Sequence, residues 1–117
     1  MKICNLDYLK NISPESNELT INIINLFLKN TPVSVLAIKN AISTSDWENI
    51  HKFTHKIKPS LTIIGLNSEI IGEFLKIKEF AKEKKNLDQI ITLFIYFETE
   101  IEKAYVELEQ ELAKLSI

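Results

Sequence analysis

The sequence has two histidines, His51 and His55, and a lysine, Lys58, that follows His55 by three residues. On an α-helix, at about 100° per residue, His51 and Lys58 both lie within about 60° of His55. An imidazole that faces water is largely neutral near neutral pH, so one ring nitrogen keeps a lone pair that can attack phosphorus. A lysine one turn away can neutralise the oxygens of a phosphoryl group. The spacing therefore favours phosphoryl transfer through His55, with Lys58 as the stabilising cation.

The segment that carries His55 is predicted to be a helix with one buried side. Asp46, followed three residues later by Asn49, is typical of a helix start, and Gly65 is typical of a helix end. Between them, a group of apolar residues falls in a sector about 160° to 240° away from His55 on a helical wheel. These residues are Ile50, Phe53, Ile57, Leu61 and Ile64. We therefore predict a helix over residues 46–65 on which His55 faces solvent, together with His51, Lys58, Pro59 and Thr62, with Lys52 at the edge of that face.

Simpler interpretations also fit these residues. His51 and His55 could bind a metal from one helix face, but no carboxylate or cysteine on that face completes a ligand set. His55 could be a solvated histidine with no function, and Lys52, Lys56 and Lys58 could be only the solvated face of an amphipathic helix. We predict no metal site, give His51 no catalytic role, and give Lys58 alone among these lysines a chemical role.

The rest of the chain is predicted to be helical. There are only two glycines and three prolines, and no alternating apolar run is bounded by a hairpin turn. The apolar spacing predicts a short helix over residues 8–12, a helix of about 15 residues after Pro14, another that begins at Thr31 and Pro32, and helices over residues 46–65, 67–85 and 87–115. Short connections favour antiparallel neighbours. We expect a single all-α domain over residues 1–117: an antiparallel up-down four-helix bundle with an additional short N-terminal helix.

The composition narrows the classes of function. The 117 residues are 45% hydrophobic and 26% charged, with a net charge of −2, so no global field attracts nucleic acid or an anionic membrane. Cys4 is the only cysteine and cannot form an internal disulfide. Residues 1–10 lack the continuous apolar run of a signal peptide. We expect a cytoplasmic monomer with no nucleic-acid or membrane partner, and no autonomous kinase activity because no Gly-rich nucleotide loop is present.

Residues 55–65, which read HKIKPSLTIIG, resemble the signature of histidine-containing phosphotransfer (HPt) domains. That signature reads His, any residue, a hydrophobic residue, Lys, Gly, Ser, and then Gly five residues later. Phe27 and Leu28 with Pro32, the Asp46 helix start and the long C-terminal helix also fall where such domains have equivalents. The similarity therefore covers essentially the whole chain.

The resemblance implies a role for each matching residue. His55 would be phosphorylated, Lys58 would be the cation near the phosphoryl group, Ser60 a helix-packing or hydrogen-bonding residue, and Gly65 a close-packing position at the helix end. Pro59 departs from the pattern, because the family commonly has glycine there. Proline cannot donate a backbone N–H, so it frees the carbonyl of His55 and changes the surface beside the histidine.

The resemblance also implies the partners. Phosphate would come from the receiver domain of a response regulator, or from a hybrid sensor histidine kinase, and the receiver would hold the Mg²⁺, so this chain would bind no cofactor. We expect docking beside His55, with His51, Lys52, Lys56, Thr62 and Leu66 as contact residues. The alternatives are a helical bundle that binds receiver domains or other signalling partners without being phosphorylated, and a purely structural helical adaptor.

Overall fold

The computed structural model describes residues 2–12 and 14–115, and within this part the chain forms five α-helices and no strand. The helices are α1 (Asp7–Ile12), α2 (Glu18–Ser43), α3 (Trp47–Ile63), α4 (Ser68–Glu83) and α5 (Leu87–Leu115). The predicted all-α class is therefore confirmed.

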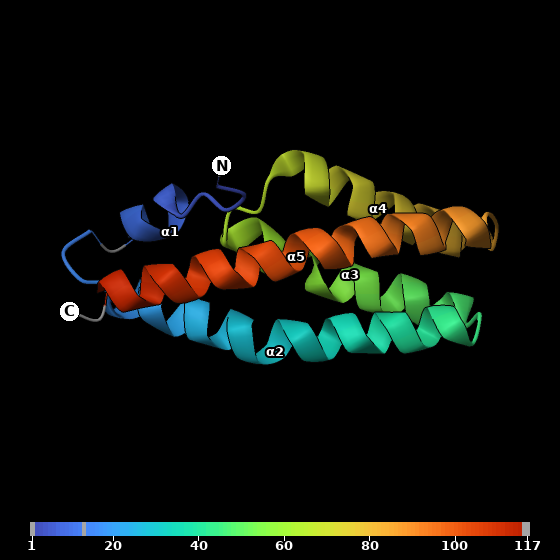
Figure 1. Cartoon of the computed structure of the whole chain (residues 1–117), viewed down its shortest axis with the longest axis horizontal. Coiled ribbons are helices and arrows are strands. Elements are labelled where there is room, and N and C mark those ends of the chain that lie inside the picture. Colours follow the sequence, from blue (N-terminus) through green and yellow to red (C-terminus); the bar gives the residue numbers. More distant parts are fainter. Residues whose placement is uncertain (1, 13, 116–117) are drawn as a thin grey trace.

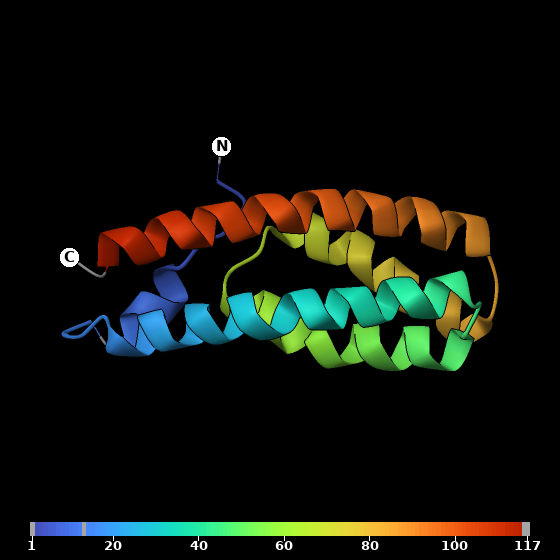
Figure 2. The ribbon, with the colours of Figure 1, turned by 60° about the horizontal axis from the view of Figure 1, so that its bottom comes forward.

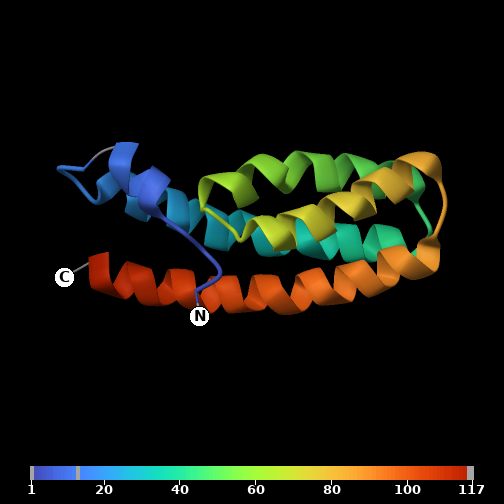
Figure 3. The same cartoon turned by 90° about the horizontal axis from the view of Figure 1, so that it is seen from above.

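The four longer helices pack around one another, and consecutive ones run in opposite directions (Figure 1). Helix α2 packs against α3 and α5, and α4 packs against the other sides of α3 and α5. The two longest helices, α2 and α5, extend beyond α3 and α4 at one end, where α1 lies (Figures 1 and 2). Seen from above, α1 lies beside the start of α2 and near the end of α5 (Figure 3).

The core lies between the four longer helices and is filled by aliphatic and aromatic side chains. Phe74 of α4 and Phe97 of α5 are both fully buried, with ring centroids 4.3 Å apart. The two ring planes are inclined by 35°, and aromatic pairs in such close contact stabilise a core beyond the area that they bury. Other fully buried members are Ile24, Ile38, Ile50, Leu61, Ile64, Ile77, Ile90 and Ile101.

One prediction was wrong: α2 is a single helix, not two helices divided at Thr31 and Pro32. Pro32 lies inside α2, where it removes the hydrogen bond to the carbonyl of Leu28 at a cost of about 3 kcal/mol. The buried face nevertheless continues through the proline, because Phe27, Thr31 and Val35 are all buried at successive four-residue steps. Burial of this continuous face offsets the lost bond, and the proline ring itself points to solvent.

The N-terminal segment is tied to two other parts of the molecule. The backbone N–H of Asn5 donates to the carbonyl of Gly65 (2.8 Å), and the N–H of Asn67 donates to the carbonyl of Ile3 (2.7 Å). On its other side, the Glu107 carboxylate of α5 accepts from the backbone N–H groups of Ile3 and Cys4 at 2.9–3.1 Å. Burial, with the nearby Glu107 charge, raises the pKa of the Cys4 thiol to about 12, so the thiol stays protonated.

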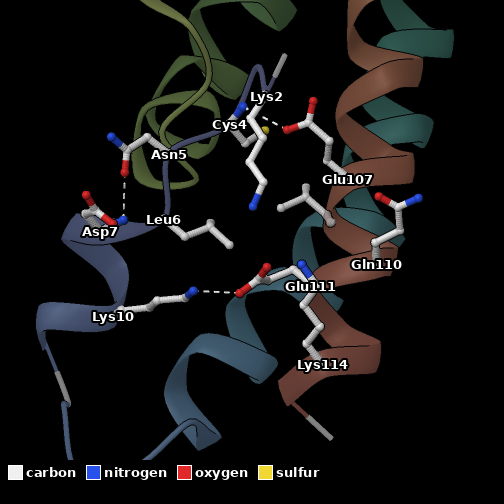
Figure 4. A pocket seen from close by; sticks show the side chains of 11 residues that line it. Lys2, Cys4, Asn5, Leu6, Asp7, Lys10, Glu107, Gln110, Glu111 and Lys114 are labelled. Carbon is white, nitrogen blue, oxygen red and sulfur yellow. Dashed lines mark hydrogen bonds and ion pairs between the residues drawn. The ribbon is translucent and has the colours of Figure 1, made fainter.

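A second tie joins α1 to the end of α5. Lys10 donates to Glu111 at 2.6 Å, and Glu111 is only 9% exposed. The hydrogen bond from Lys10 lowers the pKa of the Glu111 carboxyl, against the opposing effect of its burial. The hollow between the N-terminal segment and α5 is shown in Figure 4, where the Lys10–Glu111 and Glu107 contacts lie on opposite sides of it.

Of the five helices, α2 is long and apolar enough to cross a membrane by length and composition alone. Core helices of soluble proteins and signal sequences pass the same test, and α2 contributes eight buried residues to the packing described above.

Candidate functional site

The helix that carries His55 begins where the sequence predicts. The Asp46 carboxylate accepts from the backbone N–H of Asn49 (3.2 Å) and from its side-chain amide (2.7 Å), which caps the first turn of α3. Ile50, Ile57 and Leu61 are buried on one side of α3, and His55 on the other side is exposed. The predicted orientation of His55 is therefore confirmed.

The two histidines lie close together on the outer side of α3. The His51 and His55 rings are stacked, with centroids 6.4 Å apart and planes inclined by 10°. His51 is half-buried whereas His55 is exposed. Between them in the sequence, the buried Thr54 hydroxyl donates to the carbonyls of Ile50 (2.8 Å) and His51 (3.0 Å). The two rings are therefore nearly parallel on the same side of α3, and the His55 ring is open to a partner.

Three exposed lysines surround His55 on α3: Lys52, Lys56 and Lys58. Lys52 and Lys58 lie three residues before and after His55, so each is about 60° from it around the helix axis. Side chains on a helix lean toward its N-terminus, so Lys58 leans back over the turn that carries His55 and Lys52 leans away from it. Lys58 is therefore better placed than Lys52 to reach a group attached to the His55 ring.

Pro59 lies inside α3 and its ring is exposed beside His55. Since proline has no N–H, the carbonyl of His55 loses the helical hydrogen bond that residue 59 would otherwise donate. The next turn is reinforced by the Thr62 hydroxyl, which donates to the carbonyl of Lys58 at 3.1 Å. The His55 carbonyl is thus available to a water molecule or to a donor on a docked partner.

Ser60 and Lys56 border a shallow hollow between α3 and α2. The hollow has a volume of about 410 Å³, and its other lining residues are Ile57 of α3 and Asn30, Thr31, Val33 and Ser34 of α2. Sequence reasoning did not find this hollow. Residues next to Pro32 and Pro59 line the hollow, so the two prolines lie at the same level along the paired helices α2 and α3. This level depends on how the two helices are aligned along their axes, for which the sequence has no local signal.

Gly65 lies at the end of α3, where the backbone requires glycine. Its φ is +69°, and it follows the last turn in the pattern of a Schellman motif, with the N–H of Leu66 donating to the carbonyl of Leu61 at 3.1 Å. A Cβ at this position would collide with the backbone carbonyl of Asn5. The close packing at Gly65 is therefore between the helix end and the N-terminal segment.

Leu66 is not the surface residue that we predicted. It is 4% exposed and belongs to the core, because the turn at Gly65 directs its side chain inward, beside Leu61. Of the other predicted contact residues, Lys52, Lys56 and Thr62 are exposed on α3, and His51 is half-buried. Leu66 is thus unavailable to a partner that docks on this surface.

No group of three or more His, Cys, Asp or Glu side chains that could hold a metal ion occurs within residues 2–12 and 14–115. What α3 offers is a nucleophilic imidazole, three cations near it and an unpaired backbone carbonyl. Such a set can accept an electrophile that carries negative charge, such as a phosphoryl group.

Comparison with known proteins gives no match: no family model, no curated protein and no solved structure is similar to this chain.

Proposed function

We propose that this chain is a histidine phosphocarrier of a two-component phosphorelay. The observation that carries the proposal is the exposed ring of His55 at the middle of a capped helix, with the exposed Lys58 one turn further along α3. Phosphoryl transfer depends mainly on positioning and on stabilisation of charge, and a rigid helix with one imidazole and one cation supplies both. The HPt-like pattern of residues 55–65 supports the same function.

In the proposed reaction, a ring nitrogen of neutral His55 attacks the phosphorus of an aspartyl phosphate on a receiver domain. A P–N bond forms, the P–O bond to the aspartyl carboxyl breaks, and the aspartate leaves as a carboxylate. Lys58 attracts the phosphoryl oxygens as the group moves, and the receiver supplies the Mg²⁺. Transfer to a second receiver reverses these steps, so the chain is a carrier without kinase activity of its own.

The architecture that suits this function is an antiparallel up-down four-helix bundle with α1 as the additional short helix. In such a bundle, α3 is supported by α2 and α4 and presents one long face to solvent. We propose that receiver domains, and a hybrid sensor histidine kinase, dock on this face in the cytoplasm. His51, Lys52, Lys56 and Thr62 would contact the partner.

The test uses a matched pair of variants, His55→Gln and His51→Gln, in the full chain. Each is incubated with a receiver domain that carries radiolabelled phosphate and Mg²⁺, and the label on the chain is measured with its stability in acid and alkali. We expect acid-labile, alkali-stable label on the wild type and on His51→Gln, and none on His55→Gln.

Two other outcomes would change the proposed function. Label on His55→Gln but not on His51→Gln would move the acceptor to His51. Tight binding of receivers without label on the wild type would favour the helical module that binds its partners without carrying phosphate. In that case the exposed Pro59 ring, where related signatures have glycine, would be the first contact to examine.

A further inference from the structure

A second exposed surface lies where α2 meets α5, away from His55. Four large apolar side chains on it are well exposed: Leu36 of α2 (56%) and Ile91, Ile95 and Val106 of α5 (40%, 59% and 54%). Large apolar side chains that stay exposed along one face of a soluble protein make that face a candidate interface. We call this surface the α2/α5 face.

The Lys39–Glu98 ion pair shows that these side chains share one face. Lys39 of α2 and Glu98 of α5 meet at 3.6 Å across the junction of the two helices. Around α2, Leu36 lies about 60° from Lys39, and around α5, Ile95 lies about 60° from Glu98. Both apolar side chains therefore flank the ion pair on the outside of the molecule.

The two halves of this face carry opposite charge. Beside the acidic residues of α5, the α2 half has Lys29 and Lys39, which lie within about 80° of each other around the helix; Glu18, on the same side of α2, is about 16 Å beyond Lys29 along the axis. The α5 half has Glu98, Glu102 and Glu109, all within about 40° of Glu98. A face with a basic half and an acidic half beside it is complementary to a copy of itself turned by 180°.

We propose that the α2/α5 face joins two copies of this chain into a symmetric dimer. The twofold axis runs parallel to the helices and passes beside the junction of α2 and α5. Each α2 therefore lies against the partner's α5 without a shift along the helix axes. The Lys39 side chain of one copy then faces Glu98 of the second copy, with apolar side chains packed around this centre. The acidic α5 half makes an anionic membrane a poor alternative occupant.

The proposal departs from the monomer that we expected from composition, because the sequence does not reveal which apolar residues stay exposed after folding. It is independent of phosphate transfer. Helix α3 packs against α2 and α4, so the dimer would leave the His55 ring of each copy accessible.

The first test is sedimentation equilibrium of the wild type beside two matched variants, Leu36→Asp and Leu26→Asp. Leu26 is also on α2 and is equally exposed (57%), but it lies about 20° from Val33, which borders α3. We expect the wild type to dimerise with a Kd between about 1 µM and about 1 mM. Leu36→Asp should raise this Kd by about tenfold or more, since it places a charge in the apolar contact, and Leu26→Asp should leave it unchanged.

Charge reversal gives a second test. Lys39→Glu should weaken the dimer, and the double variant Lys39→Glu with Glu98→Lys should restore it. A wild type that stays monomeric up to about 1 mM would overturn the proposal. Equal effects of Leu36→Asp and Leu26→Asp, or binding to neutral lipid vesicles that only Leu36→Asp abolishes, would overturn it as well.

Discussion

At the scale of single residues, what separates Lys58 from the other lysines of α3 is direction. Lys52 and Lys58 are both exposed and both three residues from His55. They differ only in whether the side chain, which leans toward the helix N-terminus, leans toward or away from the His55 turn. A phosphoryl group on His55 would therefore be neutralised mainly by Lys58.

Lys58→Gln is expected to slow transfer from a phosphorylated receiver by about tenfold or more, because one stabilising donor is lost from the transition state. Lys52→Gln is the matched control and should change the rate by less than about threefold. Single-turnover measurements with excess receiver separate this rate from binding. Equal slowing by both variants would show that the lysines act by general attraction instead.

At the scale of the helices, each end of α3 is fixed by a different device. Asp46 caps the start through its side chain, whereas Gly65 ends the helix through a left-handed backbone that also touches Asn5. Between them, Pro59 removes one hydrogen bond at the turn that carries His55. The helix is therefore fixed at both ends and lacks one backbone hydrogen bond beside the histidine.

The two glycines of the chain should respond in opposite directions to alanine. Gly65→Ala must place a side chain at positive φ and push away the Asn5 carbonyl, which should lower the free energy of unfolding by about 2 kcal/mol or more. Gly72 lies inside α4 with open space around it. Gly72→Ala should therefore raise the free energy of unfolding by about 0.5–1 kcal/mol. Urea unfolding followed by circular dichroism measures both values.

A stable Gly65→Ala variant would mean that the N-terminal segment is easily displaced. Hydrogen exchange at the Asn5 and Asn67 amides distinguishes this case, because both amides donate across the junction of the segment with the α3–α4 turn.

At the scale of the whole molecule, the N-terminal segment and α1 are held between the α3–α4 turn and α5. Leu9 of α1 is fully buried, while its neighbour Tyr8 is mostly exposed. The carboxylates of Glu107 and Glu111 then connect this part of the chain to the end of α5. Residues about 100 positions apart in sequence are thus joined by a few polar contacts.

The Glu111 contact predicts a pH dependence of stability. The folded chain holds the pKa of Glu111 below its ordinary value of 4.5, chiefly through the hydrogen bond from Lys10. The stabilisation by this contact is fully present above the pKa that Glu111 has in the unfolded chain. It is lost as pH falls through the lower pKa that Glu111 has in the folded chain. We expect the stability of the wild type to fall more steeply below about pH 5 than that of Glu111→Gln.

Thermal unfolding of the wild type and of Glu111→Gln, measured at about four pH values between about pH 3 and about pH 7, checks this expectation. Glu79→Gln, at an exposed site on α4, is the control and should follow the wild type. If Glu111→Gln also follows the wild type, the Lys10–Glu111 contact does not contribute to the stability of the folded chain.

The sequence by itself determined the helical class, the start of α3 at Asp46, its end at Gly65, and the exposed side of His55. These are properties of one helix: a cap depends on residues three apart, and the buried face depends on a period of 3.6 residues. The same local patterns also placed Asn67 at the start of α4, where it accepts from the Glu69 N–H at 2.8 Å.

Only the tertiary structure decided that α2 continues through Pro32, that Leu66 is buried, and that Leu36 and Ile95 remain exposed. Each depends on contacts between distant segments. Packing against α3 and α5 offsets the bond lost at Pro32, and the turn at Gly65 directs Leu66 inward. Apolar side chains remain exposed because each helix packs its neighbours against only part of its circumference. The sequence does not specify which part of α2 and of α5 stays in solvent.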